Sequence, residues 1–261
     1  MTRPKIAAGI DVGSRTIKLV LYDGSHFLFE KIVDNTYNTA ESIKELLGEV
    51  KYDALIAAGY GRTLVEIGWD APTVSEITAF AIGCSQEFPR KKTILDMGGQ
   101  DTKVIRVNDA GKVVKFEMND RCAAGTGKFF EVMAKTLNYT LDEFASLRIT
   151  ERDPLKINSL CTVFAESEVI SLLARGENRE DIAYALHKSV VNKVSPLLKK
   201  IYDSGDIIFC GGCAKNSLLH ALLEKEMGQK ILIPKSPQLI GAYGASIIAF
   251  NTIRNQPVDS K

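Results

Sequence analysis

The chain has 261 residues, with 33 lysines and arginines against 32 aspartates and glutamates, and 45% of its residues are apolar. This length can bury two small cores or one large core, and a net charge of +1 excludes both a strongly basic surface for nucleic acid and an acidic tail. No apolar run approaches the roughly 20 residues of a membrane span, and the early Asp11 argues against a signal peptide. We therefore expect a globular, cytoplasmic protein without a nucleic-acid or membrane partner.

The predicted elements alternate between strands and helices. Short apolar runs predict strands at 5–11, 17–22, 26–33 and 52–58, and helical spacing predicts helices at 40–50 and 75–88. A polar segment at 89–92 then breaks the pattern and predicts a domain boundary. Beyond it we expect strands at 93–96, 103–107, 113–118, 206–210 and 230–233, and helices at 125–137, 162–174, 179–202, 214–227 and 239–253. This alternation indicates an α/β fold.

The two parts of the chain share a short repeat. Residues 11–18 (DVGSRTIK) align without a gap on residues 96–103 (DMGGQDTK), and the Asp, the Gly and the Lys coincide. Each segment begins at the end of an apolar strand and runs into a second strand. Three identities in eight can arise by chance, but the shared strand–turn–strand context favours duplication of one half.

An Asp-x-Gly turn between two strands is suited to binding phosphate and magnesium. Glycine lets backbone amides approach an anion closely, Ser14 and Thr16 add hydroxyl groups, and Lys18 adds a positive charge. Asp11 and Asp96 supply oxygen ligands for Mg²⁺, usually through water. One such turn is more often an ordinary hairpin, but two in register favour phosphate binding.

A third motif follows the predicted strand at 206–210. Gly211 and Gly212 open a helix there, so the backbone can lie flat against a nucleotide. The order of the three motifs resembles the actin, heat-shock chaperone and sugar-kinase superfamily, which binds ATP–Mg²⁺ in a cleft between two duplicated, ribonuclease-H-like domains. The resemblance implies domains at 1–90, joined by the helix at 239–253, and at 91–238. It also implies nucleotide contacts by Gly13, Ser14, Arg15, Thr16, Gly98, Gly99, Gly211 and Gly212.

The five cysteines are Cys84, Cys122, Cys161, Cys210 and Cys213. A cysteine is most often a small buried apolar side chain, and the single CxxC at 210–213 has no second pair or clustered histidine to complete a zinc site, so we interpret it as incidental. Cys122 and Cys161 both precede predicted helices, where the helix dipole favours the thiolate that binds iron–sulfur clusters. Two structural cysteines, or a nucleophile, remain alternatives.

Longer segments resemble one family, the ATP-dependent activators of 2-hydroxyacyl-CoA dehydratases and the benzoyl-CoA reductase ATPase subunits (the BadF/BadG/BcrA/BcrD type). The segments are 9–14, 59–62, 96–101, 119–127 and 161–171. Membership implies a homodimer of anaerobic metabolism with one 4Fe–4S cluster, held by Cys122 and Cys161 of both chains. It further implies an upstream ferredoxin or flavodoxin and electron transfer to a dehydratase-like iron–sulfur protein. Cys210 and Cys213 depart from the expected family pattern.

The same resemblance gives roles to further residues by position. Lys18 would neutralise developing phosphate charge, and Gln100 or Asp101 would position the attacking water. Gly127, Glu166 and Gln238 would lie near the nucleotide, although Glu166 is more typical of a surface helix charge. The 59–62 motif (GYGR) either approaches phosphate or simply turns the chain.

Two other functions remain open. A small-molecule kinase of the same fold would have no use for Cys122 and Cys161, and such kinases are usually longer. A non-redox regulatory ATPase would bind zinc, or nothing, at these cysteines.

Overall fold

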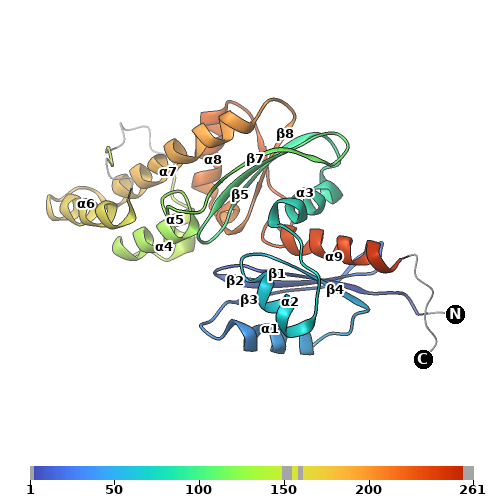
Figure 1. The fold of residues 1–261 in the computed structure, drawn as a ribbon. Coiled ribbons are helices and arrows are strands. Elements are labelled where there is room, and N and C mark those ends of the chain that lie inside the picture. Colours follow the sequence, from blue (N-terminus) through green and yellow to red (C-terminus); the bar gives the residue numbers. More distant parts are fainter. Residues whose placement is uncertain (1–2, 149–154, 158–160, 255–261) are drawn as a thin grey trace. The chain divides into compact units, whose positions relative to one another are not determined.

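The computed structural model describes residues 3–148, 155–157 and 161–254. Its contacts divide the chain into two units, which we describe separately (Figure 1). The first unit comprises residues 1–90, 107–113 and 235–261, and the second comprises residues 91–106 and 114–234. In the part of the chain that the structure describes, no helix combines the length and apolar character that a membrane crossing requires.

The first unit is a four-stranded sheet with helices on both faces (Figure 1). Its strand order is β3 (Phe27–Asp34), β2 (Thr16–Tyr22), β1 (Ala7–Val12) and β4 (Ala54–Ala58), with β1 antiparallel to β2 and parallel to β4. The helices α1 (Thr39–Gly48) and α2 (Arg62–Trp69) cover one face, and α3 (Glu76–Glu87) and α9 (Ile240–Ile253) cover the other. The last helix of the chain therefore packs on the first strand.

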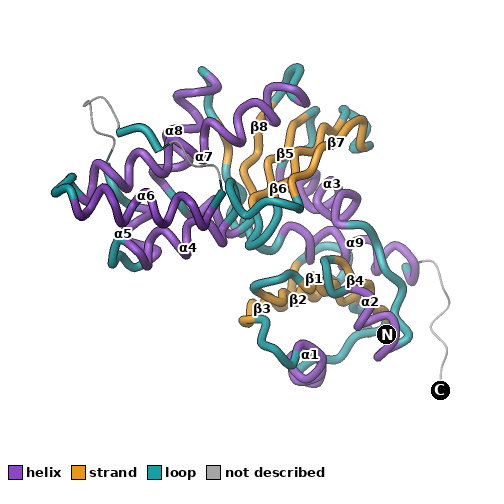
Figure 2. Tube along the Cα trace, turned by 60° about the vertical axis from the view of Figure 1, so that its left-hand side comes forward, coloured by secondary structure: helices purple, strands orange, loops and turns teal. Residues whose placement is uncertain are grey.

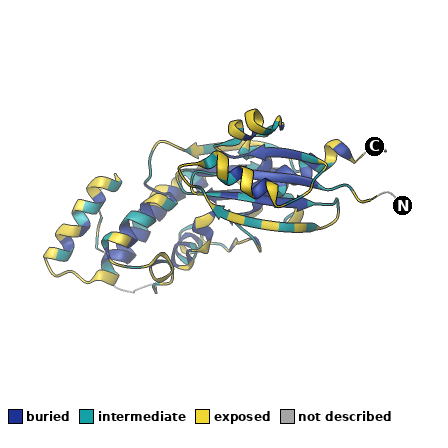
Figure 3. Ribbon diagram, turned by 90° about the horizontal axis from the view of Figure 1, so that it is seen from below, coloured by how far each residue is buried: buried dark blue, intermediate teal, exposed yellow. Residues whose placement is uncertain are grey.

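Small residues set the depth of that packing. A Cβ at Gly9 of β1 would collide with the backbone of Ala242 and Ser246 in α9, and a Cβ at Gly244 of α9 would collide with the backbone of Ala79 in α3. Glycine at these positions lets the helix backbone rest directly on the strand and on α3. Figure 3 shows the result as buried central strands and exposed outer helix faces.

The second unit is a five-stranded sheet in the order β7 (Val113–Asn119), β6 (Thr102–Val107), β5 (Lys92–Met97), β8 (Asp206–Cys210) and β9 (Ile231–Leu232). Its helices are α4 (Gly127–Thr136), α5 (Leu141–Ala145), α6 (Thr162–Ala174), α7 (Arg179–Ile201) and α8 (Ser217–Met227), with a 3-10 turn η1 (Gly212–Lys215). The helices α4, α6 and α7 pack on one another (Figure 2). Their apolar faces form one core with β5, β8 and α8.

The predicted α/β class is confirmed, and most predicted elements match the structure within a few residues. The short helices α2 and α5 were not predicted. The start of α5 has a capping box, in which the side chains of Thr140 and Glu143 each accept a hydrogen bond from the other residue's backbone amide. The predicted helix at 214–227 was wrong at its start. Residues 212–215 form the 3-10 turn η1, and Asn216 caps α8 by accepting the amide of Leu219. Residues 158–160, which directly precede Cys161, lie outside the described residues.

Candidate functional site

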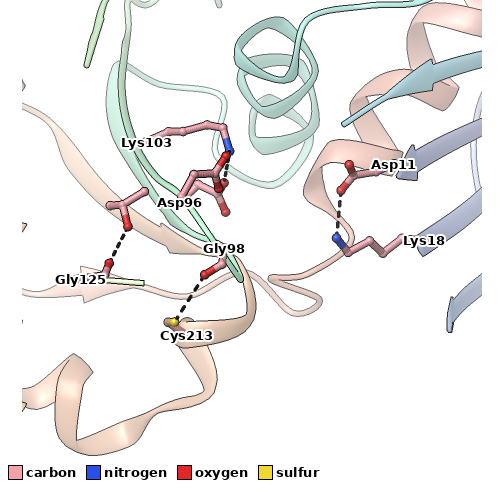
Figure 4. Close-up of polar contacts among 9 residues, drawn as sticks. Asp11, Lys18, Asp96, Gly98, Lys103, Gly125 and Cys213 are labelled. Carbon is pink, nitrogen blue, oxygen red and sulfur yellow. Dashed lines mark hydrogen bonds and ion pairs between the residues drawn. The ribbon is translucent and has the colours of Figure 1, made fainter. Parts of the chain in front are cut away.

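The first Asp-x-Gly turn joins β1 to β2. Asp11 faces Lys18 in the antiparallel register, and Nζ of Lys18 lies 3.2 Å from Oδ2 of Asp11 (Figure 4). The amide of Gly13 closes the turn by donating to the carbonyl of Thr16 at 3.1 Å. The aspartate is therefore buried at the end of its strand, beside the cation that follows seven residues later.

Two glycines make room for the Asp11 carboxylate. Gly59 has a φ of +93°, and a Cβ there would lie 2.5 Å from Oδ1 of Asp11; a Cβ at Gly241 would lie 3.0 Å from Oδ2. The 59–62 motif turns the chain from β4 into α2, and the amide of Gly61 donates to the carbonyl of Val12. This motif thus forms part of the wall around Asp11. Gln238 lies in the same unit, just before the start of α9.

The second turn repeats the first. Nζ of Lys103 lies 3.5 Å from Oδ2 of Asp96, and the amide of Gly98 donates to the carbonyl of Asp101 at 2.9 Å (Figure 4). The ion pair and the turn-closing hydrogen bond occur at the same offsets as in the first turn. This correspondence supports duplication, because the aligned segments share their hydrogen bonding as well as three residue types.

Lys103 is a functional candidate that the sequence analysis did not select. Its ammonium also lies 2.6 Å from Oδ2 of Asp101, and it is only 3% exposed. The repeat could have identified it, since Lys103 aligns with Lys18. Of the two residues expected to position the attacking water, Asp101 thus pairs with a buried cation, whereas the neighbouring Gln100 is exposed.

The third motif is brought against the second turn. Strands β5 and β8 are parallel, with Asp96 opposite Cys210. Gly211 then adopts a φ of +82°, and a Cβ there would lie 2.6 Å from Oδ1 of Asp96. Only glycine fits this approach without displacing the carboxylate. Gly212 follows as the first residue of η1, so the second unit gathers Asp96, Gly98, Gly99, Gly211 and Gly212.

The CxxC cysteines are buried beneath these loops. Burial first, and then the nearby charges of Asp96 and Glu131, raise the pKa of the Cys213 thiol to about 12. A thiol that stays protonated at neutral pH is a poor metal ligand. Within the described residues, no three histidine, cysteine, aspartate or glutamate side chains gather as a metal site.

The start of α4 is bonded to the second turn. The amide of Gly127 donates to the carbonyl of Gly98 at 2.9 Å, and the amide of Lys128 donates to the carbonyl of Gly99 at 2.8 Å. Nearby, the hydroxyl of Thr102 donates to the carbonyl of Gly125 at 2.6 Å (Figure 4). The helix that follows Cys122 is therefore held by the loop that follows Asp96.

The two selected cysteines differ in position. Cys161 is exposed and is the N-cap residue of α6. Cys122 is half-buried and lies four residues before Thr126, the N-cap of α4; its carbonyl accepts a hydrogen bond from the Asn119 side chain at 2.9 Å. Cys161 therefore lies directly at a helix start, whereas Cys122 does not, and the first amides of α4 bond Gly98 and Gly99.

The donor set nevertheless fits a shared cluster. Cys84, Cys210 and Cys213 are buried, whereas Cys122 is half-buried and Cys161 is exposed. Two thiols per chain supply half of a Cys₄ site. Beside Cys161, α6 exposes Val163 and Phe164, each 67% exposed. Such an apolar outer face is typical of a surface that another protein covers.

Glu166 is not brought to the second turn. Its carboxylate accepts a hydrogen bond from the hydroxyl of Thr136 at 3.1 Å, which joins α6 to the last residue of α4. Gly127 begins the same helix nine residues earlier, roughly 14 Å along its axis. In this structure Glu166 therefore links two helices, and Gly98 and Gly99 lie at the opposite end of α4.

Known proteins resemble the chain over almost its whole length. The family model of the BadF/BadG/BcrA/BcrD ATPase family matches residues 8–249. The (R)-2-hydroxyglutaryl-CoA dehydratase activating ATPase of Acidaminococcus fermentans is 38% identical over 251 residues, which cover 93% of this chain and 96% of the relative.

Two solved structures share the fold. Component A of the A. fermentans (R)-2-hydroxyglutaryl-CoA dehydratase has a TM-score of 0.87 at 37% identity, covering 95% of this chain and 98% of that one. The activator of the 2-hydroxyisocaproyl-CoA dehydratase from Clostridium difficile, with bound ADPNP, has a TM-score of 0.85 at 35% identity, covering 95% of each chain. The predicted actin-like fold and the resemblance to the activators are confirmed. The chain belongs to the BadF/BadG/BcrA/BcrD ATPase family.

Proposed function

We propose that the chain is an ATP-dependent, low-potential one-electron donor that acts as a homodimer on a partner iron–sulfur enzyme, such as a 2-hydroxyacyl-CoA dehydratase or a related reductase. The observation that carries this proposal is the pair of hydrogen bonds from Gly127 and Lys128 to Gly98 and Gly99. They connect a loop with phosphate-binding features to the segment that contains Cys122. An ATPase that acts on a thiol-bound group needs such a connection.

The nucleotide half of the proposal rests on the repeated turns. The family is an ATPase family, and the relative from C. difficile binds ADPNP. We infer that Gly13–Thr16 and Gly98–Gly99 bind phosphates, and that Asp11 and Asp96 hold Mg²⁺ through water. Lys18 and Lys103 then neutralise charge near the phosphates, and Gly211 and Gly212 contact the adenosine. Gln100 is the exposed candidate for positioning water, since Asp101 pairs with Lys103.

The redox half rests on the accessible cysteines. Cys122 and Cys161 of two chains would hold one 4Fe–4S cluster, which supplies a one-electron reductant when bound. The exposed apolar side chains Val163, Phe164 and Ile170 of α6 supply a face for association of two copies. A ferredoxin or flavodoxin of the cytoplasm would deliver the electron.

The chain's own contribution is to connect the phosphate-binding loop to the cysteines. A change in the loop at Gly98 and Gly99 on ATP binding or hydrolysis displaces the carbonyls that hold α4. Because Cys122 lies in the loop that leads directly into α4, its position follows that change. Each hydrogen bond at the start of α4 thus takes part in coupling the phosphate-binding loop to Cys122.

Purification without oxygen, followed by iron and sulfide analysis, tests the proposal against the kinase and the non-redox ATPase. We expect about four iron atoms per two chains, and loss of iron in Cys122→Ser and Cys161→Ser. The matched control is Cys213→Ser, which changes a buried thiol and should keep its iron. An iron-free wild-type dimer that hydrolyses ATP would favour the regulatory ATPase, and phosphorylation of a small acceptor would favour the kinase.

A further inference from the structure

His187 on α7 is buried without exposed surface and contacts three other elements. Its ring centroid lies 5.0 Å from that of Phe130 on α4 and 4.6 Å from that of Phe144 on α5. Its Nε2 lies 2.9 Å from Nδ2 of Asn216, the residue between η1 and α8. The imidazole therefore joins the helical core of the second unit to the end of the Gly211–Asn216 loop.

The hydrogen-bond partners fix the protonation of this ring. Nδ1 of His187 lies 2.8 Å from the carbonyl of Ala183, which can only accept, so Nδ1 carries the proton. Oδ1 of Asn216 accepts the amide of Leu219 at 2.8 Å, so the Asn216 side chain presents its NH₂ group to His187. Nε2 must then accept, and the imidazole is neutral. Burial favours the same state, because it lowers the pKa of His187 to about 4.

The loop that ends at Asn216 is fixed at both ends. At its start, Gly211 lies against Asp96, as described above. At its end, the amide of Asn216 donates to the carbonyl of Cys213 at 3.0 Å, and the side chain of Asn216 donates to His187. A buried hydrogen bond between side chains outside both phosphate turns therefore holds the end of the loop that begins at Gly211 and Gly212.

We propose that His187 is a positioning residue for the nucleotide, acting through Asn216 on the loop formed by residues 211–216. This inference rests on the proposed function, in which Gly211 and Gly212 contact the adenosine. Removing the acceptor leaves the NH₂ group of Asn216 buried without His187, so the loop relaxes and must be reordered when nucleotide binds. The loss should appear as weaker nucleotide binding.

The test is ADP affinity by calorimetry, measured on four variants alongside their melting temperatures. His187→Leu removes the acceptor, and Asn216→Ser removes the donor while retaining a good cap for α8. Both should weaken ADP binding by about tenfold. His187→Gln restores an acceptor oxygen and should bind ADP within about threefold of wild type. Val191→Ala is the matched control, because it truncates a fully buried side chain one turn further along α7.

The outcomes separate three cases. Weak binding in His187→Leu and Asn216→Ser, with rescue in His187→Gln and normal affinity in Val191→Ala, supports the proposal. Normal affinity in Asn216→Ser, or equal loss in Val191→Ala at a matched fall in melting temperature, overturns it and reduces His187 to a core residue. If His187→Leu does not fold, Asn216→Ser and His187→Gln still decide. Absence of ADP binding by the wild type would instead contradict the proposed nucleotide site itself.

Discussion

The backbone amide of Gly127 donates a hydrogen bond to the carbonyl of Gly98 at 2.9 Å. This contact joins the first residue of α4 to the loop after Asp96. A Cβ at Gly127 would lie 3.1 Å from the same carbonyl, so the helix approaches the loop as closely as a side chain allows. The amides at a helix start are commonly free to bind anions; here two of them bind the loop and thereby connect it to the segment of Cys122.

Gly127→Pro should loosen the attachment of α4 to the loop, because only the hydrogen bond from Lys128 to Gly99 would remain. Proline is accepted at the first position of a helix and lacks the amide that bonds Gly98. We expect ATP hydrolysis to persist, and nucleotide-dependent changes in the alkylation rate of Cys122 to become smaller in the cluster-free protein. Gly127→Ala adds the Cβ and keeps the amide, so it should retain those changes. Equal nucleotide dependence in both variants would contradict the role of this hydrogen bond.

The two Asp–Lys pairs should not contribute equally to stability. Lys103 lies beside two carboxylates and is 3% exposed, whereas Lys18 lies 3.2 Å from Asp11, a longer distance than the 2.6 Å between Lys103 and Asp101. We expect Lys103→Met to lower the free energy of unfolding by about 3 kcal/mol, and Lys18→Met to lower it less. Urea unfolding measures both, and the reverse order would show that the Asp96 turn is not held by Lys103.

Substitution of either turn aspartate should strongly slow ATP hydrolysis while the chain still folds. Asp11→Asn and Asp96→Asn preserve side-chain size and remove the charge that would hold Mg²⁺–water, so we expect hydrolysis to fall about a hundredfold or more. Steady-state ATPase assays against Mg²⁺ concentration are the measurement. Full activity in either variant would remove that turn from the proposed magnesium site.

His187 predicts a component of acid instability. Its pKa is lowered to about 4 in the folded chain, by burial first, so the unfolded chain takes up the proton at higher pH. The stabilisation is complete above pH 6.5 and falls as the pH decreases from 6.5 to about 4, by about 3 kcal/mol. His187→Gln does not titrate there, so its unfolding free energy should fall by about 2 kcal/mol less than that of the wild type between pH 7 and pH 4.5. Parallel pH profiles would contradict the burial of a neutral imidazole.

The cysteines should react in the order of their exposure. In cluster-free protein, iodoacetamide should modify Cys161 first and Cys122 more slowly, because Cys161 is exposed and Cys122 is half-buried. Cys213 should resist modification at pH 8, since its buried thiol has its pKa raised to about 12. Mass spectrometry of time points gives the order. Rapid labelling of Cys213 in folded protein would show that the loop at 211–216 opens.

The sequence predicted local features of the site better than contacts between distant segments. The repeat aligned Asp11 and Lys18 with Asp96 and Lys103, and in each turn the structure pairs the aspartate with the lysine seven residues later. It gave no sign that the amide of Gly127 would meet Gly98, since 29 residues separate them and their approach depends on how α4 packs. For the same reason Glu166, selected by its position in a motif, contacts Thr136 instead of the second turn.

The sequence also did not predict short helices or contacts between buried polar groups. The helix α2 follows two glycines and has eight residues, too few for a clear helical period. His187 carried no motif, and its contact with Asn216 is visible only once α7 and α8 pack.

Electron paramagnetic resonance of the anaerobically purified, dithionite-reduced chain, with and without MgATP, tests the central claim most directly. The proposed coupling between the Asp96 loop and Cys122 predicts the signal of a reduced 4Fe–4S cluster, lost in Cys122→Ser, with a line shape that changes on adding MgATP in the wild type and changes less in Gly127→Pro. A wild-type chain that hydrolyses ATP but shows no iron–sulfur signal, or a signal that MgATP leaves unchanged, would contradict the account.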